Sequence, residues 1–429
     1  MSAPTDSAIS GTFGLLSSLT ALASGARSAE ECIEDALERI RAVDGRVAAW
    51  VTVDEDGARA QARRLDALPA PQRGPLHGLP IGVKDIVDVR GFPTRCGSTA
   101  TSGAPATSDA PLVRALRDAG AVILGKTVTT EFAYFSPGPT ANPRRLGHTP
   151  GGSSSGSAAA VAAGMTPLAV GTQTAASVTR PAAYCGVFSI VLPHGVSDTG
   201  GIAGLAESLD APGLLGSDPL GLAAVIEALN LSDLKQDSPQ NFSTLLVWRP
   251  GPAFGVHHEM LSAIDQVGEL AAQHGLHVEE FAIDAQALTL VDAHRRIMAY
   301  EAARQSRAAK LPRESLSQAL QDLLDEGAVL DRTSYEQAVD SARTARQQVL
   351  DRLHSANAAI LAPAAQGTAP EGLSATGNPI MSRPWQAIGL AAATFPAGLS
   401  AGLPLGAQLV GPGDGRALLR LADRLHCAS

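Results

Sequence analysis

Segments with helical spacing of apolar residues alternate along this chain with short apolar runs. Ser28 and Glu31 form a capping box, and apolar residues at positions 32, 33, 36, 37 and 40 follow, which predicts an amphipathic helix. Ser108 is expected to cap a helix that runs to Arg117, and Gly120 is expected to end it. Residues 47–53 are β-like, and the apolar runs 79–83 and 121–124 predict buried strands.

The same order of helix and strand returns in the second half of the chain. A helix is predicted over residues 258–274, before a strand over residues 276–283. Thr333 and Glu336 predict the start of a helix that continues to Leu353, and an apolar run over residues 358–361 follows. Residues 417–426 predict a last helix. Helices that alternate with strands are typical of a three-layer α/β protein with a parallel or mixed sheet.

The stretch from Gly151 to Gly186 holds two clusters of small, hydroxyl-bearing residues. Residues 151–156 form the first cluster and residues 171–177 the second; an alanine-rich helix that stops at Gly164 and an apolar run over residues 167–170 separate them. A flexible linker would lack these elements. A phosphate-binding loop would end in Gly-Lys-Ser or Gly-Lys-Thr, and a nucleophile elbow would place G-x-S-x-G around Ser177. The stretch therefore predicts an ordered, buried site with hydroxyl groups and uncovered backbone amides.

Composition and charge disfavour several other classes of protein. The 429 residues are 45% hydrophobic and 17% charged, which is ample for a large core. The net charge of −9 is spread out, and no basic block predicts nucleic-acid binding. The four cysteines are far apart, without metal-ligand spacing, and fit a reducing compartment. The apolar segment 13–23 has no basic residue before it, and no run approaches the ~18 apolar residues of a membrane span, so we expect a soluble cytoplasmic protein.

Two motifs, in the right order, resemble those of the amidase signature family of serine hydrolases, which use a Ser-Ser-Lys triad. The family stretch begins GGSS and continues with a turn of the form T-x-G-S, then Arg, Pro and Cys-Gly; this chain has GGSS over residues 151–154, TAAS over 174–177, RP over 180–181 and CG over 185–186. The family lysine lies upstream in G-[IL]-P-x-x-V-K-D, and residues 78–85 read GLPIGVKD. Weaker similarity continues almost to the end of the chain.

The resemblance implies a fold as well as a reaction. It implies a single domain over residues 1–429, a three-layer α/β/α arrangement with a large twisted mixed β-sheet and a signature core at about residues 75–220. Residues 225–349 are richer in Glu, Gln, Arg and Ala and carry little of the resemblance. We expect them to form a helical section that covers the core and helps to shape the substrate entrance.

The resemblance also implies a role for each residue of the triad. Ser177 is expected to be the nucleophile, Lys84 the base, and Ser153 the relay that carries the proton between them. A lysine in an apolar run is unusual even without the resemblance, because lysine is rarely buried unpaired. Asp85 is either the ion-pair partner of Lys84 or, if Lys84 is the base, points away from it.

Further residues are expected to support this triad. The oxyanion hole is expected to consist of the N–H groups of four consecutive residues, Thr174, Ala175, Ala176 and Ser177. Ser154 and Arg180 are expected to support the two turns rather than to react. Four residues lie where relatives place the substrate, namely Phe132, Ala133, Tyr134 and Phe135. Their rings are equally compatible with core packing and with an apolar or aryl part of the substrate.

Three departures from the family pattern bear on oxyanion geometry and substrate preference. Ala176 stands where the family commonly has glycine, Thr179 stands where it often has Arg or another large residue, and residues 189–193 lack its Gly-x-Lys-Pro.

The leading hypothesis is an amidase that acts on small amides, anilides or carbamates, the last being urethanase activity. It would need no cofactor and no metal, and its partner would be a small-molecule substrate. The sequence does not decide between a monomer and a homodimer. A glutamine-hydrolysing amidase subunit of a tRNA-dependent amidotransferase and an inactive scaffold are the alternatives. Thr179 disfavours the first alternative, and the retained triad residues disfavour the second.

Overall fold

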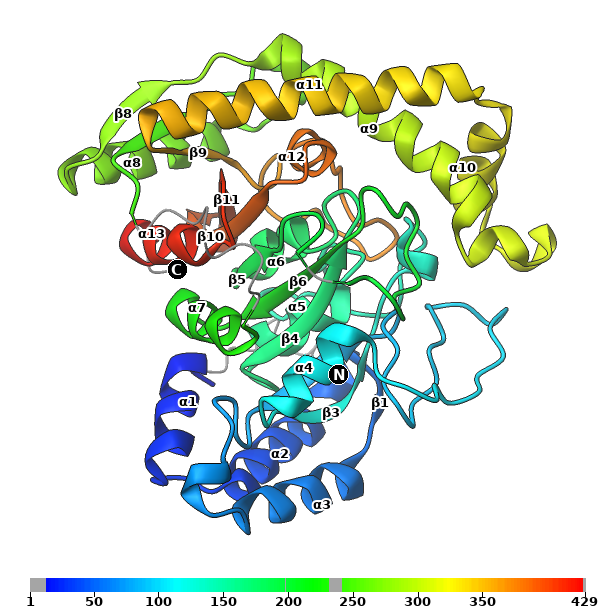
Figure 1. The fold of residues 1–429 in the computed structure, drawn as a ribbon, viewed down its shortest axis with the longest axis vertical. Coiled ribbons are helices and arrows are strands. Elements are labelled where there is room, and N and C mark those ends of the chain that lie inside the picture. Colours follow the sequence, from blue (N-terminus) through cyan, green and yellow to red (C-terminus); the bar gives the residue numbers. More distant parts are fainter. Residues whose placement is uncertain (1–12, 197, 231–240, 427–429) are drawn as a thin grey trace, which may run out of the picture.

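A single β-sheet of eleven strands forms the centre of the computed structural model, which describes residues 13–196, 198–230 and 241–426 (Figure 1). The strands are β1 Trp50–Val53, β2 Pro80–Lys84, β3 Val122–Thr127, β4 Leu168–Gln173, β5 Phe188–Val191, β6 Ala211–Gly216, β7 Thr244–Val247, β8 His277–Glu280, β9 Ala358–Pro363, β10 Ala391–Ser400 and β11 Leu403–Gly411. Their order across the sheet is β1-β3-β2-β4-β6-β5-β10-β11-β9-β7-β8. The neighbours β3, β2 and β4 are parallel, as are β9, β7 and β8, and the other neighbours are antiparallel. The prediction of a mixed sheet is confirmed.

Helices lie on both faces of this sheet (Figure 1). They are α1 Leu15–Ser24, α2 Ala29–Val47, α3 Glu55–Asp66, α4 Pro111–Asp118, α5 Ser155–Ala162, α6 Thr179–Cys185, α7 Pro219–Ala228, α8 His258–Gln273, α9 Asp284–Gln305, α10 Gln318–Val329, α11 Arg332–Ala356, α12 Arg383–Ala387 and α13 Arg416–Leu425.

Two glycines of β11 show which helix covers which face. A Cβ atom on Gly406 would meet Ala183 of α6, whereas one on Gly411 would meet Leu418 of α13. Residues an odd number apart on a strand point to opposite faces, so α6 and α13 lie on opposite sides of the sheet. Helix α5 packs on α6, and α7 packs on α13. The three-layer α/β/α arrangement expected from the sequence is therefore observed.

The capping box at the start of α2 is confirmed. The Ser28 hydroxyl accepts a hydrogen bond from the N–H of Glu31, and the Glu31 carboxylate accepts one from the N–H of Ser28. The expected start of α4 at Ser108 is wrong. This helix begins at Pro111 with Ala110 as its N-cap, because proline at the first helical position has a suitable φ and no N–H to satisfy.

Two other boundaries also differ from the prediction. Helix α11 is capped by Asp331, whose carboxylate accepts a hydrogen bond from the N–H of Ser334, and Thr333 lies inside its first turn. Residues 47–49 are not strand. Helix α2 extends through Val47, Ala48 caps it with a φ of 53°, and β1 begins only at Trp50.

The section over residues 225–349 is not purely helical. It includes α8 to α10 and most of α11, but it also supplies β7 and the edge strand β8, and only β8 was expected from the pattern. Helices α9, α10 and α11 pack together, and Figure 1 shows α11 lying across one end of the molecule. Among the described residues, no helix is both long and apolar enough to cross a bilayer.

Candidate active site

Lys84 ends the buried strand β2 and lies at the centre of the site. Its side chain is fully buried, and its Nζ lies 2.7 Å from the Oγ of Ser153, 2.9 Å from the Oγ1 of Thr172 and 3.2 Å from the Thr172 carbonyl oxygen. Thr172 belongs to β4, which pairs with β2 in parallel, so the end of one strand faces the end of the next. The fold thereby brings Lys84 and Ser153 together across 69 positions of the sequence.

Burial changes the protonation of this lysine. Removal from water lowers the pKa of Lys84 from 10.5 to about 7, because an ammonium group loses its hydration, and the negative charge of Asp210 opposes this shift. About half of the Lys84 side chains are therefore neutral at pH 7. A neutral amine 2.7 Å from a hydroxyl can accept its proton.

Asp85 points away from Lys84. Its carboxylate forms an ion pair of 2.9 Å with Lys126 of β3, and both side chains are buried. The N–H of Arg95 also points at this carboxylate, at 3.3 Å. Successive side chains of an extended chain project to opposite sides, which keeps this acid away from the Lys84 amine. Asp85 is therefore the partner of a different lysine, and no carboxylate of its own segment holds Lys84 in the charged form.

Ser153 and Ser154 lie in the turn that leads into α5. Ser153 contacts Lys84, whereas the Oγ of Ser154 lies 3.4 Å from the Thr172 carbonyl oxygen. The backbone N–H of Ser154 donates to the carbonyl of Ser177 at 3.1 Å. The first serine-rich turn is thus joined directly to the second one.

Ser177 lies in that second turn, between β4 and α6. In the described parts of the chain, the backbone N–H groups of Thr174, Ala175, Ala176 and Ser177 donate no hydrogen bond to the protein. All four residues line one cavity, together with Ser153. Four consecutive unpaired amides at a cavity wall can receive an oxyanion.

Gln173 supports this turn and was not singled out from the sequence. Its Oε1 accepts from the N–H of Val178 at 2.9 Å, from the N–H of Thr179 at 3.1 Å and from the Thr179 hydroxyl at 3.0 Å. Its Nε2 donates to Gln386 at 3.0 Å. The side chain of Gln173 therefore supplies the acceptor that the first amides of α6 need, and it does so from behind the turn.

Asp210 and His294 hold the other end of the turn, and sequence reasoning missed both. The Thr174 hydroxyl donates a short hydrogen bond to Asp210, and His294 Nε2 donates to the Thr174 carbonyl at 2.7 Å. Burial raises the pKa of Asp210 to about 7 and lowers that of His294 to about 3, so His294 is neutral at pH 7. No local pattern points to these contacts, since His294 lies 120 positions from Thr174.

Arg180 joins the first turn to the segment before α12. Its guanidinium donates to the carbonyls of Gly152 and Gly377 at 2.7 and 2.8 Å and to the Thr376 hydroxyl at 3.0 Å. Burial lowers its pKa to about 10, so Arg180 remains charged at neutral pH. The guanidinium of Arg180 thus bonds neutral oxygens rather than a carboxylate.

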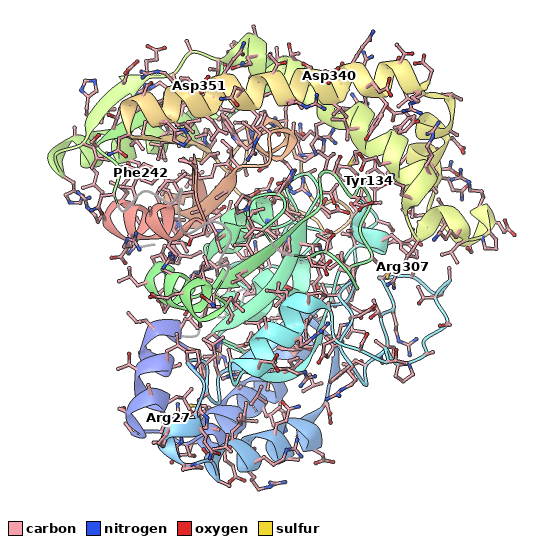
Figure 2. The ribbon with its side chains drawn as sticks, viewed as in Figure 1. Arg27, Tyr134, Phe242, Arg307, Asp340 and Asp351 are labelled. Atoms are coloured by element: carbon pink, nitrogen blue, oxygen red, sulfur yellow. The ribbon has the colours of Figure 1, made fainter. Side chains whose placement is uncertain are left out.

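Ser177 faces a space of about 360 Å³, part of it open to solvent, which we call the inner cavity. It lies between Ser153, the 174–177 turn, residues 133–135, Arg180 and Arg383. A wider space of about 1180 Å³, the outer vestibule, shares Tyr134, Phe135 and Arg383 with it and is bounded by residues 374–380 and by α9. Tyr134, which is labelled in Figure 2, thus borders both spaces.

Three of the four expected substrate residues reach the inner cavity. Ala133, Tyr134 and Phe135 line it, whereas Phe132 lies in the hydrophobic core and is only 2% exposed. The backbone of Phe132 has a positive φ of 44°, within a short 3₁₀ turn over Glu131–Ala133. Because of this turn, the side chain of Phe132 points into the core, whereas the next three residues line the inner cavity.

The described residues contain no group of three or more His, Cys, Asp or Glu side chains that could hold a metal ion. The expectation that no metal is required stays a prediction.

The chain matches known proteins over most of its length. Residues 31–416 match the family model described as Amidase. A glutamyl-tRNA(Gln) amidotransferase subunit from Lysinibacillus sphaericus is 30% identical over 440 residues, which cover 90% of each chain. The corresponding protein from Thermobifida fusca is 42% identical over 229 residues, which cover 52% of this chain and 46% of that protein. A crystal structure of an amidase superposes with a TM-score of 0.85 at 28% identity, covering 96% of this chain and 99% of the other.

Proposed function

Since this chain belongs to the amidase signature family of hydrolases, we propose that it cleaves the C–N bond of small amides, anilides or carbamates through an acyl-enzyme on Ser177. The observation that carries the proposal is the buried contact of 2.7 Å between Lys84 and Ser153, which opens onto the cavity that Ser177 lines. The pKa of about 7 gives Lys84 the neutral form that a base needs.

Acylation begins when the Ser177 hydroxyl attacks the carbonyl carbon of the substrate. The Ser177 proton passes to Ser153 as Ser153 passes its own proton to neutral Lys84. The carbonyl oxygen becomes an oxyanion, and the amides of residues 174–177 stabilise it. When the tetrahedral intermediate collapses, the proton returns through Ser153 to the leaving nitrogen, the C–N bond breaks and Ser177 keeps the acyl group.

Deacylation repeats this route with water in place of Ser177. Water attacks the acyl carbon and gives one proton through Ser153 to Lys84. The C–O bond to Ser177 then breaks, and the same proton returns to the Ser177 oxygen. The products are a carboxylic acid and an amine. When the substrate is a carbamate, cleavage of the same C–N bond gives an amine and a monoester of carbonic acid. Each turnover restores Lys84 to its neutral form.

Trapping the acyl-enzyme tests the proposal. Brief incubation with an activated ester, acid quench and mass spectrometry of the peptides should show an acyl adduct on the peptide that carries Ser177. Ser177→Ala should lose the adduct and turnover while it melts within a few degrees of the parent protein. An adduct on Ser153 or Ser154 instead would assign the nucleophile to the first turn and refute the role of Ser177.

A second candidate function follows from the curated relatives, which belong to glutamyl-tRNA(Gln) amidotransferases. A chain with that role would hydrolyse glutamine within a complex. Affinity purification of this chain from its own cells, followed by a glutaminase assay, separates the two functions. Stable partner proteins together with glutamine as the preferred amide would favour the amidotransferase role, whereas small-amide hydrolysis by the isolated chain favours the amidase.

A further inference from the structure

Arg383 is the first residue of α12, and it borders both the inner cavity and the outer vestibule. Only 7% of its surface is exposed. It therefore lies at the passage between the two spaces, on the wall of the cavity that also holds Ser177.

The guanidinium of Arg383 has no partner within the described residues. Its Nη1 is buried without any hydrogen bond, and among the described residues no ion pair joins the side chain to a carboxylate. Arg144 shows the usual situation, because its guanidinium donates to two carbonyl oxygens at 2.9 and 3.0 Å. A buried cation without a partner is unfavourable, and such a group at a cavity wall indicates a ligand that completes its bonding.

The charges around the two cavities have one sign. Arg180, Arg295 and Arg383 line them, and among the described residues no Asp or Glu does. Arg180 already donates to three oxygens, and Arg295 lies 3.9 Å from the exposed Glu326. Burial lowers the pKa of Arg383 to about 10, which leaves it charged at neutral pH. Arg383 is therefore the arginine beside Ser177 whose positive charge has no partner among the described residues.

We propose that Arg383 binds a carboxylate of the substrate, so that the enzyme prefers small amides that carry a carboxylate close to the scissile bond. The inference rests on the proposed function for the identity of the scissile bond. The planar guanidinium matches a carboxylate with two parallel hydrogen bonds. Ser177 and Arg383 line the same inner cavity, which requires a short connection between the scissile bond and the carboxylate of the substrate. The carboxylate lies either on the acyl side, as in the monoamide of a short dicarboxylic acid, or on the amine side, as in an N-acyl amino acid.

Matched pairs of substrates test this preference. Succinamate against butanamide probes the acyl side, and N-acetylglycine against N-propylacetamide probes the amine side. In one pair, kcat/KM should favour the anion by at least about 30-fold, as expected for a charge-assisted bidentate contact. Arg383→Gln should reduce that ratio by a similar factor, mainly through KM, and Arg383→Lys should restore part of it. Arg343→Gln is the matched control, because Arg343 is an exposed arginine of α11 that lines neither space.

Binding measured without turnover separates this inference from the proposed function. In a Ser177→Ala background, calorimetry should show that the preferred anion binds at least about 30-fold more tightly than its neutral counterpart, and Arg383→Gln should remove that difference. Melting temperatures verify that each variant is folded. Equal binding of the anion and the neutral amide, or unchanged anion binding in Arg383→Gln, would overturn the role of Arg383 even if amides are hydrolysed. Arg383-dependent anion binding without any amide hydrolysis or Ser177 adduct would support the anion site and refute the proposed reaction.

Discussion

Lowering the pH through 7 should remove activity, because it protonates the base. With a pKa of about 7, roughly half of Lys84 is neutral at pH 7, whereas with the ordinary value of 10.5 about 0.03% would be neutral. Burial thus increases the reactive form more than a thousandfold. The profile of kcat/KM should rise tenfold per pH unit below about pH 6, level off above about pH 8 and stand at about 3% of its plateau at pH 5.5.

Lys84→Arg tests whether the loss of a proton matters. Arginine keeps a positive charge at this position but stays protonated, so the variant should lose most amide hydrolysis at every pH between 5.5 and 9.5. Lys126→Arg is the matched control, because Lys126 is equally buried but pairs with Asp85 at 2.9 Å. It should keep the acidic limb of the profile.

The assay measures kcat/KM on a neutral amide at constant ionic strength, so that only the enzyme titrates. Full activity of Lys84→Arg, or a flat profile of the parent enzyme from pH 5.5 to 8, would refute the general-base role. Lys84 would then be a structural cation.

The same pKa shift makes stability depend on pH. The unfolded chain holds the Lys84 proton up to about 10.5 and the folded chain only up to about 7, so the unfolded state binds more protons between these values. The contribution of Lys84 to the free energy of unfolding is therefore unfavourable below pH 7, and this penalty fades as the pH rises toward 10.5. Urea titrations of the parent and of Lys84→Met at pH 7 and pH 9.5 should show this slope only in the parent.

The remaining predictions concern the 174–177 turn. Ala176→Gly should keep kcat within tenfold, because glycine accepts any backbone geometry of alanine, and should cost up to about 1 kcal/mol of stability; a larger loss of kcat in a folded variant would mean that alanine is specifically required. Gln173→Leu should destabilise the protein by about 1–3 kcal/mol, since the N–H groups of Val178 and Thr179 lose their buried acceptor. It should lower kcat more than it raises KM, because it acts on the oxyanion turn, and an unchanged kcat would contradict a positioning role for Gln173.

Local patterns predict the parts of this fold that depend on near neighbours. The Ser28 capping box and the buried strand before Lys84 involve residues a few positions apart, and both were predicted from the sequence. The resemblance to a family located Ser153 and Ser177. Gln173 could not be found in this way, because its contact with Gln386 spans 213 positions. Arg383 could not be found either, because the feature that distinguishes it is a buried Nη1 without a hydrogen bond, which only the structure shows.

Phe132 shows a further limit of sequence reasoning. It is adjacent to Ala133 and Tyr134, which line the inner cavity, and it is as apolar as a substrate pocket requires. Its backbone adopts a positive φ of 44°, and the ring packs into the core. A pattern of residue types predicts that a segment is near a site, but the direction of each side chain depends on backbone angles that the pattern does not contain.

One departure from the family pattern, Thr179, is part of the structure that supports the 174–177 turn. Thr179 is fully buried, and its hydroxyl lies 3.0 Å from Gln173 Oε1 and 2.7 Å from the Ser382 hydroxyl, so a larger side chain would not fit at this position without rearrangement. Gln173 satisfies the amides of Val178 and Thr179, which follow Ser177, whereas the amides of residues 174–177 donate no hydrogen bond within the described parts of the chain. The turn can therefore be rigid and still present unpaired N–H groups to a substrate, which is the condition for stabilising charge that develops only in the transition state.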